Sequence, residues 1–303
     1  MTRAESQLRA DWPLLARERE MGLLTTALAT GEPGGGVLIG GAGIGRTRLA
    51  REVAETAVHS GRATEWLVAT RAAASLPFGA TLSLLPLDEP VAEPYIFIRG
   101  VIRYMEALAQ PYPPVVCIDD AHLLDDASAA LIHQLALRKL VFLLITVRQE
   151  EPVPDAVVAL WKDGHLIPIE LKPLPPEAVD TLIALTLGHQ VDALTRAELQ
   201  AAAAGNPFAL GEALVRGLRD ATLVQHGQVW SSRASLLTAR ERQVCLLAAS
   251  GLSSQLIADR LVLSVRTVNN HLTRAYGKLG VSRRADLMKL LNGSRHVMNP
   301  TGR

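Results

Sequence analysis

Short apolar runs alternate with longer amphipathic stretches along the first part of the chain. The amphipathic stretches at 16–29 and 46–58 have helical spacing, and a flexible, glycine-rich approach at 31–36 lies between them. The apolar runs have the length of buried strands and fall at 37–39, 64–69, 114–118, 141–147 and 166–171. Strands that alternate with helices predict an α/β fold, with a parallel sheet covered by helices on both faces.

The pattern changes after the last apolar run. Residues 175–218 have helical periodicity, interrupted at Gly205-Asn206-Pro207. A small hairpin is expected in the Ser-rich segment 222–236, with its turn at His226-Gly227, and four short helices are expected beyond Thr238. We therefore divide the chain into a tail at 1–15, an α/β domain at 16–221, a linker at 222–236 and an all-helical domain at 237–303.

Charge is distributed unevenly between these domains. Residues 231–303 contain 12 Lys/Arg and 3 Asp/Glu, a net charge of +9, whereas residues 1–230 contain 19 and 27, a net charge of −8. An acidic body joined to a basic terminal domain is expected when only that terminal domain meets nucleic acid. A merely solvated basic surface would not explain why the excess lies in one segment.

The turn after the first apolar run has the spacing of a phosphate-binding loop. It reads Gly40-Gly41-Ala42-Gly43-Ile44-Gly45-Arg46-Thr47. Glycines let the backbone curl so that its N–H groups point at phosphate oxygens, and the following helix directs its positive end to the same place. The Thr47 hydroxyl is expected to coordinate Mg²⁺. The nucleotide-binding residues of this loop are therefore predicted to be Gly40, Gly43, Gly45, Arg46 and Thr47.

One position of the loop departs from the usual pattern, because Arg46 stands where lysine is expected. The chain has 5 Lys and 26 Arg, so a general drift toward arginine accounts for the substitution. Arginine can still pair with phosphate, but its larger, planar head displaces the nucleotide from the hydrolytic geometry, and small displacements cost much rate. We therefore expect ATP binding with slow or absent hydrolysis.

The apolar run at 114–118 ends in two acids. Asp119 is expected to hold Mg²⁺ through water, and Asp120 is the candidate catalytic residue that orients the attacking water. Solvated acids at an ordinary strand end are the alternative, which the phosphate-binding loop upstream disfavours. Arg148 ends the next apolar run, where it either senses a γ-phosphate or is a plain charge at a strand end.

The segment 264–279 carries the clearest functional pattern of the basic domain. One buried stripe recurs every three or four residues and consists of Val265, Val268, Leu272, Ala275 and Leu279. The opposite face has no acid, so its asparagines can read adenine edges and its arginines can reach guanine or phosphate. A surface helix that binds protein is the alternative. The predicted DNA-binding residues are Arg266, Thr267, Asn269, Asn270, Thr273, Arg274 and Lys278.

Other features of the basic domain predict its helix ends and its last helix. Thr238 and Glu241 have the spacing of a capping box, and Ser253 and Ser264 are expected to cap the next two helices. The final helix at 285–291 has two interpretations that the sequence does not separate. In one it pairs two subunits, and in the other it only closes the four-helix core. The residues concerned are Leu287, Met288 and Leu291.

Both ends of the chain resemble one protein family. The first 220 residues resemble the ATPase domain of the large ATP-binding LuxR-type regulators, and residues 237–291 resemble the LuxR-type helix-turn-helix. The matching stretches of the first part are Arg17-Glu18-Arg19-Glu20, the loop into Thr47-Arg48-Leu49, Pro77-Phe78-Gly79-Ala80, Asp119-Asp120-Ala121-His122, Thr146-Val147-Arg148 and Gly205-Asn206-Pro207. Those of the second are 253–261, Thr267-Val268, His271, Lys278-Leu279-Gly280-Val281 and Arg283. The long helical repeat region that the family has between these domains is missing.

The resemblance implies a transcription regulator, usually an activator, that binds ATP and Mg²⁺. It further implies a homodimer on double-stranded DNA, RNA polymerase as a partner and a cytoplasmic location. The P-loop domain would then act as a switch, or as an assembly module with a dead nucleotide site. The alternative is a functional NTPase whose helical domain binds protein rather than DNA.

Two further patterns exclude other classes of protein. No apolar run approaches the roughly 20 residues of a membrane helix, and the charged N-terminus has no signal-peptide core, so no membrane partner is expected. Cys117 and Cys245 lie in apolar runs and are expected to be buried thiols rather than metal ligands or disulfide partners.

Overall fold

The computed structural model describes residues 12–85, 94–109, 111–188, 190–284 and 286–287. By compactness the chain forms two units. The N-terminal unit is Leu14–Pro173, and the C-terminal unit joins Leu174–Arg303 to Met1–Pro13. The α/β domain predicted from the sequence extends beyond this division, to residue 221, and its boundary stays a prediction.

The N-terminal unit is built on one parallel sheet. Its five described strands have the order β2-β3-β4-β1-β5, so two crossovers bring β4 between β1 and β3. The predicted α/β fold with a parallel sheet is therefore confirmed. The strands are β1 (Gly35–Gly40), β2 (Thr64–Val68), β3 (Val115–Asp119), β4 (Phe142–Arg148) and β5 (Ile167–Glu170).

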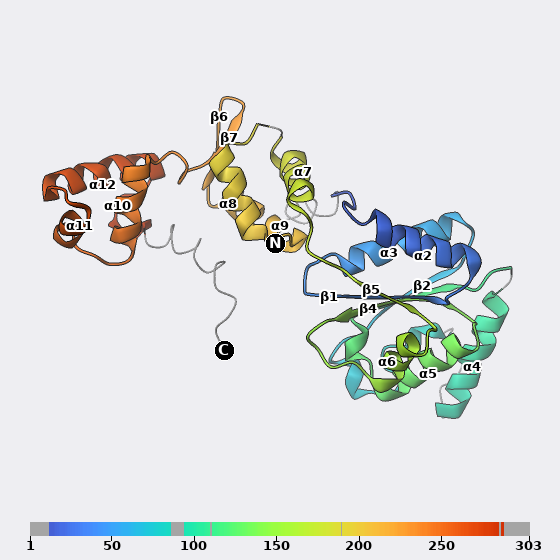
Figure 1. Ribbon diagram of the computed structural model, residues 1–303. Coiled ribbons are helices and arrows are strands. Elements are labelled where there is room, and N and C mark those ends of the chain that lie inside the picture. The colour runs from blue at the N-terminus through green and yellow to red at the C-terminus, as the bar shows by residue number, and fades with distance from the viewer. Residues whose placement is uncertain (1–11, 86–93, 110, 189, 285, 288–303) are drawn as a thin grey trace. The chain divides into compact units, whose positions relative to one another are not determined.

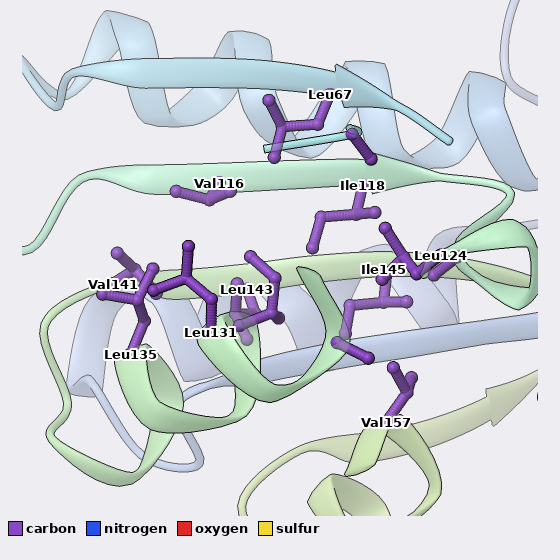
Figure 2. Packing of buried hydrophobic residues seen from close by; sticks show 14 of the residues in the cluster. Leu67, Val116, Ile118, Leu124, Leu131, Leu135, Val141, Leu143, Ile145 and Val157 are labelled. Atoms are coloured by element: carbon purple, nitrogen blue, oxygen red, sulfur yellow. The ribbon is translucent and has the colours of Figure 1, made fainter. Parts of the chain in front are cut away.

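Helices cover both faces of this sheet (Figure 1). Successive strand residues point to opposite faces, so the sheet has two separate cores. Leu38, Cys117 and Leu144 pack toward α2 and α3, whereas Ile118 and Ile145 pack toward the other helices (Figure 2). The helices of the two layers are α2 (Glu18–Thr30) and α3 (Arg46–His59), and α4 (Pro94–Leu108), α5 (Asp126–Leu137) and α6 (Asp155–Lys162).

The prediction of a flexible segment at 31–36 is wrong for its last two residues, because Gly35 and Gly36 belong to β1. A β-carbon on Gly35 would lie only 1.9 Å from the Leu143 carbonyl oxygen of β4. Glycine therefore allows the close approach of two strands here, rather than mobility.

The C-terminal unit begins with α7 (Pro176–Leu187), α8 (Ala193–Ala203) and α9 (Pro207–Arg219). A hairpin of β6 (Leu223–His226) and β7 (Val229–Ser232) follows, as predicted for this segment. The turn consists of Gly227 and Gln228, one residue later than predicted, because His226 still pairs with Val229. Gly227 has a φ of 63°, a conformation that suits glycine.

Three further helices follow the hairpin in this unit. They are α10 (Ala239–Ala249), α11 (Ser254–Leu261) and α12 (Val265–Leu279). Their shared core contains Val244, Ile257 and Leu272. Among the described residues, no helix combines the length and the apolar character needed to cross a membrane.

Both cysteines are buried free thiols, which confirms the expectation of small core side chains. Burial raises the pKa of Cys117 to about 12 and that of Cys245 to about 11, so neither is a thiolate at neutral pH.

Candidate functional site

The predicted phosphate-binding loop connects the end of β1 to the start of α3. Gly43 and Gly45 have φ angles of 74° and 104°, a region that side chains with a β-carbon rarely enter. Gly45 is also the N-cap of α3, so the positive end of a 14-residue helix faces the loop. The loop therefore has the glycine conformations and the helix N-terminus that the sequence predicted for an anion-binding turn.

A network of hydroxyl and carboxylate oxygens lies beside this loop. The Thr47 hydroxyl donates to the two carboxylate oxygens of Asp119 at 2.9 and 3.1 Å. The Thr146 hydroxyl donates to Asp119 Oδ1 at 2.7 Å and accepts from the Asp120 N–H at 2.9 Å. The sequence predicted Thr47 and Asp119 but gave Thr146 no role of its own. A polar residue inside the apolar run of β4 was the available signal.

Arg46 is directed into the protein and not into solvent. Its side chain is 7% exposed, and Nη1 donates to the Gly40 carbonyl at 2.9 Å. Nη2 donates to Asp120 Oδ1 at 3.4 Å. Burial lowers the pKa of Arg46, and the charge of Asp120 opposes this shift. The charge that should follow a transferred phosphate is thus held by groups of the protein itself.

Asp120 stands among three basic side chains. Its φ of 54° turns it away from the strand, and Oδ1 lies 3.7 Å from Arg148 Nε and 3.9 Å from His122 Nδ1. Burial, more than any charge, lowers the pKa of His122, so His122 is neutral at pH 7. Sequence reasoning assigned no role to His122, although it lies only two residues after Asp120.

The residues present fit a nucleotide with Mg²⁺. A hard cation prefers oxygen ligands, and Thr47 and Asp119 place such oxygens together at the N-terminus of α3. The buried Nε of Arg148 and Nδ1 of His122 have no hydrogen-bond partner within the described residues. Polar atoms of this kind suit a site that is completed by a ligand.

The helices of the C-terminal domain begin at the predicted caps. Thr238 and Glu241 form the reciprocal capping box at the start of α10. Ser253 accepts from the Leu256 N–H, and Ser264 accepts from the Thr267 N–H, so both serines cap the helices that follow them.

The predicted buried stripe of α12 is confirmed, since Val268, Leu272, Ala275 and Leu279 are buried and Val265 packs partly against the core. The opposite face is solvent-exposed and contains no acid along the whole of α12. The predicted DNA-binding residues that are exposed on it are Arg266, Asn269, Asn270, Thr273 and Arg274.

Thr267 and Lys278 lie at the border of this face and are half-buried. The Lys278 ammonium donates to Glu241 Oε2 at 2.6 Å, and the Glu241 side chain is almost fully buried. Lys278 thus joins α12 to the capping box of α10. The role in DNA binding assigned to it from the sequence remains a prediction, and the pairing shows a second, structural role.

The described residues of the fourth helix bear on its two interpretations. Leu287 is 0% exposed and belongs to the core of α10, α11 and α12. For this residue the structure supports closure of the helical core. Met288 and Leu291 lie outside the described residues.

Fold and geometry together define the class: a P-loop nucleotide-binding unit joined to a helix-turn-helix domain. Comparison with protein families agrees at both ends. Residues 235–291 match the bacterial regulatory proteins of the luxR family, and residues 13–145 match the AAA ATPase domain. The chain therefore carries a LuxR-type helix-turn-helix domain behind an AAA ATPase domain.

Similar curated proteins match a short part of this chain. A provisionally named HTH-type transcriptional regulator of Mycobacterium bovis is 50% identical over 52 residues, which is 17% of this chain and 6% of that protein. The transcriptional activator protein ExaE of Pseudomonas putida is 43% identical over 60 residues, 20% of this chain and 28% of its own length. The match thus spans well under two thirds of either relative.

Solved structures give weaker likenesses. DnaA from Aquifex aeolicus, bound to AMPPCP, has a TM-score of 0.46 and 12% identity, covering 97% of this chain and 98% of that one. The Thermotoga maritima RuvB Holliday junction branch migration motor has a TM-score of 0.41 and 14% identity, covering 85% and 86%. At these scores the likenesses say nothing about function.

Proposed function

We propose that this protein is a DNA-binding transcription regulator that reads duplex DNA with α12 and binds ATP in its P-loop unit as a switch. The observation that carries the proposal is the exposed, acid-free face of α12, whose other face packs in the core of the helical domain. The luxR-family match and the transcriptional names of the relatives support it. No comparable feature favours a protein-binding role for α12.

Individual residues of α12 have distinct tasks in this proposal. Asn269 and Asn270 are exposed amides on one helical turn, suited to bidentate contact with an adenine edge. Arg266 and Arg274 carry charge to guanine or phosphate. Thr267 and Thr273 bind the DNA backbone, which fixes register without specifying sequence.

The P-loop unit would hold the nucleotide through its loop and helix end. Backbone N–H groups between Gly40 and Gly45 would face the phosphates, and Thr47 with Asp119 would hold Mg²⁺. Arg148 would meet the terminal phosphate, and Asp120 would orient the attacking water. Hydrolysis should be slow, because Arg46 is held by the Gly40 carbonyl and by Asp120.

The proposal also includes two protein partners. A second copy of the chain would occupy the other half of a two-fold DNA site, and RNA polymerase would receive the activating signal. In this proposal the P-loop unit sets the affinity for DNA by whether ATP and Mg²⁺ are bound.

The test is fluorescence anisotropy of a labelled duplex pool with the full chain, with and without ATP and Mg²⁺. We expect binding that weakens steeply with salt, because lysine and arginine contacts release counterions, and an affinity that changes when ATP is added. The double variant Arg266→Ala/Arg274→Ala should lose most of this binding. Arg138→Ala, which removes an exposed arginine of the N-terminal unit, is the matched control.

Equal binding by the double variant and the wild type would contradict the role of α12. DNA binding that ignores ATP, in a protein that still binds ATP, would leave the P-loop unit as an assembly module and would overturn the switch.

A further inference from the structure

Arg17 carries a buried charge that neither the nucleotide contacts nor the DNA-binding face explains. Its side chain is 5% exposed although it lies at the very start of α2. Nη2 donates to the Lys172 carbonyl at 2.7 Å and to the Ile44 carbonyl at 3.4 Å, and Nη1 donates to the Ala16 carbonyl at 3.2 Å. One guanidinium therefore joins its own segment at Ala16 to Ile44 and Lys172, which are distant from it in the sequence.

The contact with Ile44 connects Arg17 to the phosphate-binding loop itself. Ile44 is a loop residue, and its side chain is buried in the same core as Leu171. A β-carbon on Gly40 would lie 3.0 Å from Ile44 Cγ2 and 3.3 Å from the Leu171 carbonyl oxygen. The loop and the residues after β5 are thus packed as one block. A change of the loop backbone at Ile44 on phosphate binding would therefore be felt at Arg17, which donates to the Ile44 carbonyl.

The other two contacts of Arg17 lie where the chain passes between its compact units. These passages fall at Pro13/Leu14 and at Pro173/Leu174. Lys172 immediately precedes the second, and Arg17 follows shortly after the first. Prolines 173, 175 and 176 fix their φ angles, which reduces the freedom of the chain directly after Lys172.

The first passage is constrained as well. Ala16 has a φ of 52°, a left-handed conformation that costs an ordinary residue about 1 kcal/mol and persists only when its surroundings impose it. On the far side of the passage, Trp12 Nε1 donates to Thr186 Oγ1 of α7 at 3.0 Å. The short stretch between Trp12 and Arg17 is therefore held at both ends.

We propose that Arg17 is a positioning residue that couples the state of the phosphate-binding loop to both passages of the chain between its units. It does so by holding the carbonyls of Ile44, Lys172 and Ala16 on one planar guanidinium, whose forked donors fix several acceptors at once. The inference rests on the proposed nucleotide switch. It names Arg17 as the residue that transmits the ligand-bound state of the loop out of the P-loop unit.

Hydrogen exchange of the full chain, with and without ATP and Mg²⁺, tests this coupling. In the wild type we expect ATP to slow exchange in the loop 40–47 and also, about tenfold, in 166–175. In Arg17→Met the loop should still respond at saturating ATP, whereas the response of 166–175 should disappear. Arg17→Lys keeps the charge but not the fork, so it should retain a small part of that response.

Arg19→Met is the matched control, because Arg19 is an exposed arginine on the same helix, and it should behave as the wild type does. If Arg17→Met does not fold, as judged by its thermal melt, Arg17→Lys decides the matter. A full ATP response of 166–175 in a folded Arg17 variant would overturn the inference. So would the lack of any such response in a wild type that binds ATP.

A parallel anisotropy titration separates this inference from the proposed function. An Arg17-dependent exchange response together with ATP-independent DNA affinity would support the coupling and overturn the switch. Loss of the ATP effect on DNA affinity in Arg17→Met, with unchanged affinity in the absence of ATP, would support both.

Discussion

The phosphate-binding site and the exposed face of α12 differ in how their functional groups are engaged. In the P-loop unit, Arg46 is paired with Asp120, and Thr47 is paired with Asp119. On α12, by contrast, Asn270 and Arg274 are exposed to solvent. A nucleotide would therefore have to compete with internal partners of the protein, whereas a DNA duplex on α12 would meet side chains that are already exposed.

This difference has a consequence for energetics. Each internal pair that ATP displaces makes the binding free energy less favourable. The ATP site can therefore exist in a paired and a nucleotide-bound state, and its affinity for ATP is lower as a result. The DNA-binding face needs no rearrangement of its own, and its affinity should follow charge and salt directly.

The largest effect is expected at Arg46. Arg46→Lys replaces the planar head by a compact ammonium that can follow the terminal phosphate, so ATP turnover should rise about a hundredfold. Steady-state phosphate release from the full chain measures this change. Arg48→Lys on the same helix is the control and should leave turnover as it was. Brisk turnover in the wild type would show that the internal pairing of Arg46 does not limit the chemistry.

The next effect concerns the border of the DNA-binding face. Lys278→Ala leaves the buried Glu241 carboxylate without its ammonium, which should lower the stability of the helical domain by about 2 kcal/mol. Thermal or urea unfolding measures the loss. Arg274→Ala, which removes an exposed charge from the same helix, should weaken DNA binding with little change in unfolding. Equal unfolding of the two variants would mean that the Lys278–Glu241 pair adds nothing.

The same pair predicts a dependence on pH. Burial by itself would raise the pKa of Glu241, but hydrogen bonds from Lys278 and Thr238 outweigh it and lower the pKa below the ordinary 4.5. Because the folded-state pKa is lowered, the stabilisation is complete above pH 4.5 and is lost as the pH falls through the folded value. Unfolding free energies measured from pH 6 down to 3 should show this loss in the wild type and much less of it in Lys278→Ala.

A smaller, sequence-dependent effect is expected at Asn270. Asn270→Ala should relax the preference at one base pair by about 2 kcal/mol while leaving affinity for unrelated duplexes nearly unchanged. Selection of bound sequences from a random pool, followed by titration of single-base variants, measures both quantities. Identical base preference in the variant would remove Asn270 from the reading face.

The smallest effect is expected in the turn before α12. Val262 is 90% exposed and has a φ of 54°, which strains a β-branched residue. Val262→Gly should therefore stabilise the helical domain by about 1 kcal/mol. Val262→Ala keeps the β-carbon and should recover less. Destabilisation by glycine would mean that the turn is not strained.

The sequence predicted α12 almost residue by residue, because its stripe and its caps are local. Val268 and Leu272 repeat at helical spacing, and Ser264 caps the helix three residues before its hydrogen-bond partner. The strands of the sheet were found for the same reason, from continuous apolar runs. The order of the strands in the sheet was not predicted, because an apolar run such as that of β4 does not indicate which strands will pair with it.

The contacts of the phosphate-binding site could be predicted only in part. Thr47 and Asp119 follow from the loop spacing and from an acid at a strand end. The pairing of Arg46 with Asp120 and the link from Lys278 to Glu241 depend on tertiary packing. Arg17 shows the limit most clearly, because its three carbonyl partners come from the fold and not from side chains that a sequence displays.

The affinity of the full chain for a mixed-sequence DNA duplex, measured as a function of salt, decides whether α12 is a DNA-binding helix. If the acid-free face of α12 binds the duplex, the logarithm of the affinity should fall linearly with the logarithm of salt concentration, and Arg266→Ala/Arg274→Ala should flatten that slope. Absence of binding at low salt, or a slope that the double variant does not change, would contradict the account.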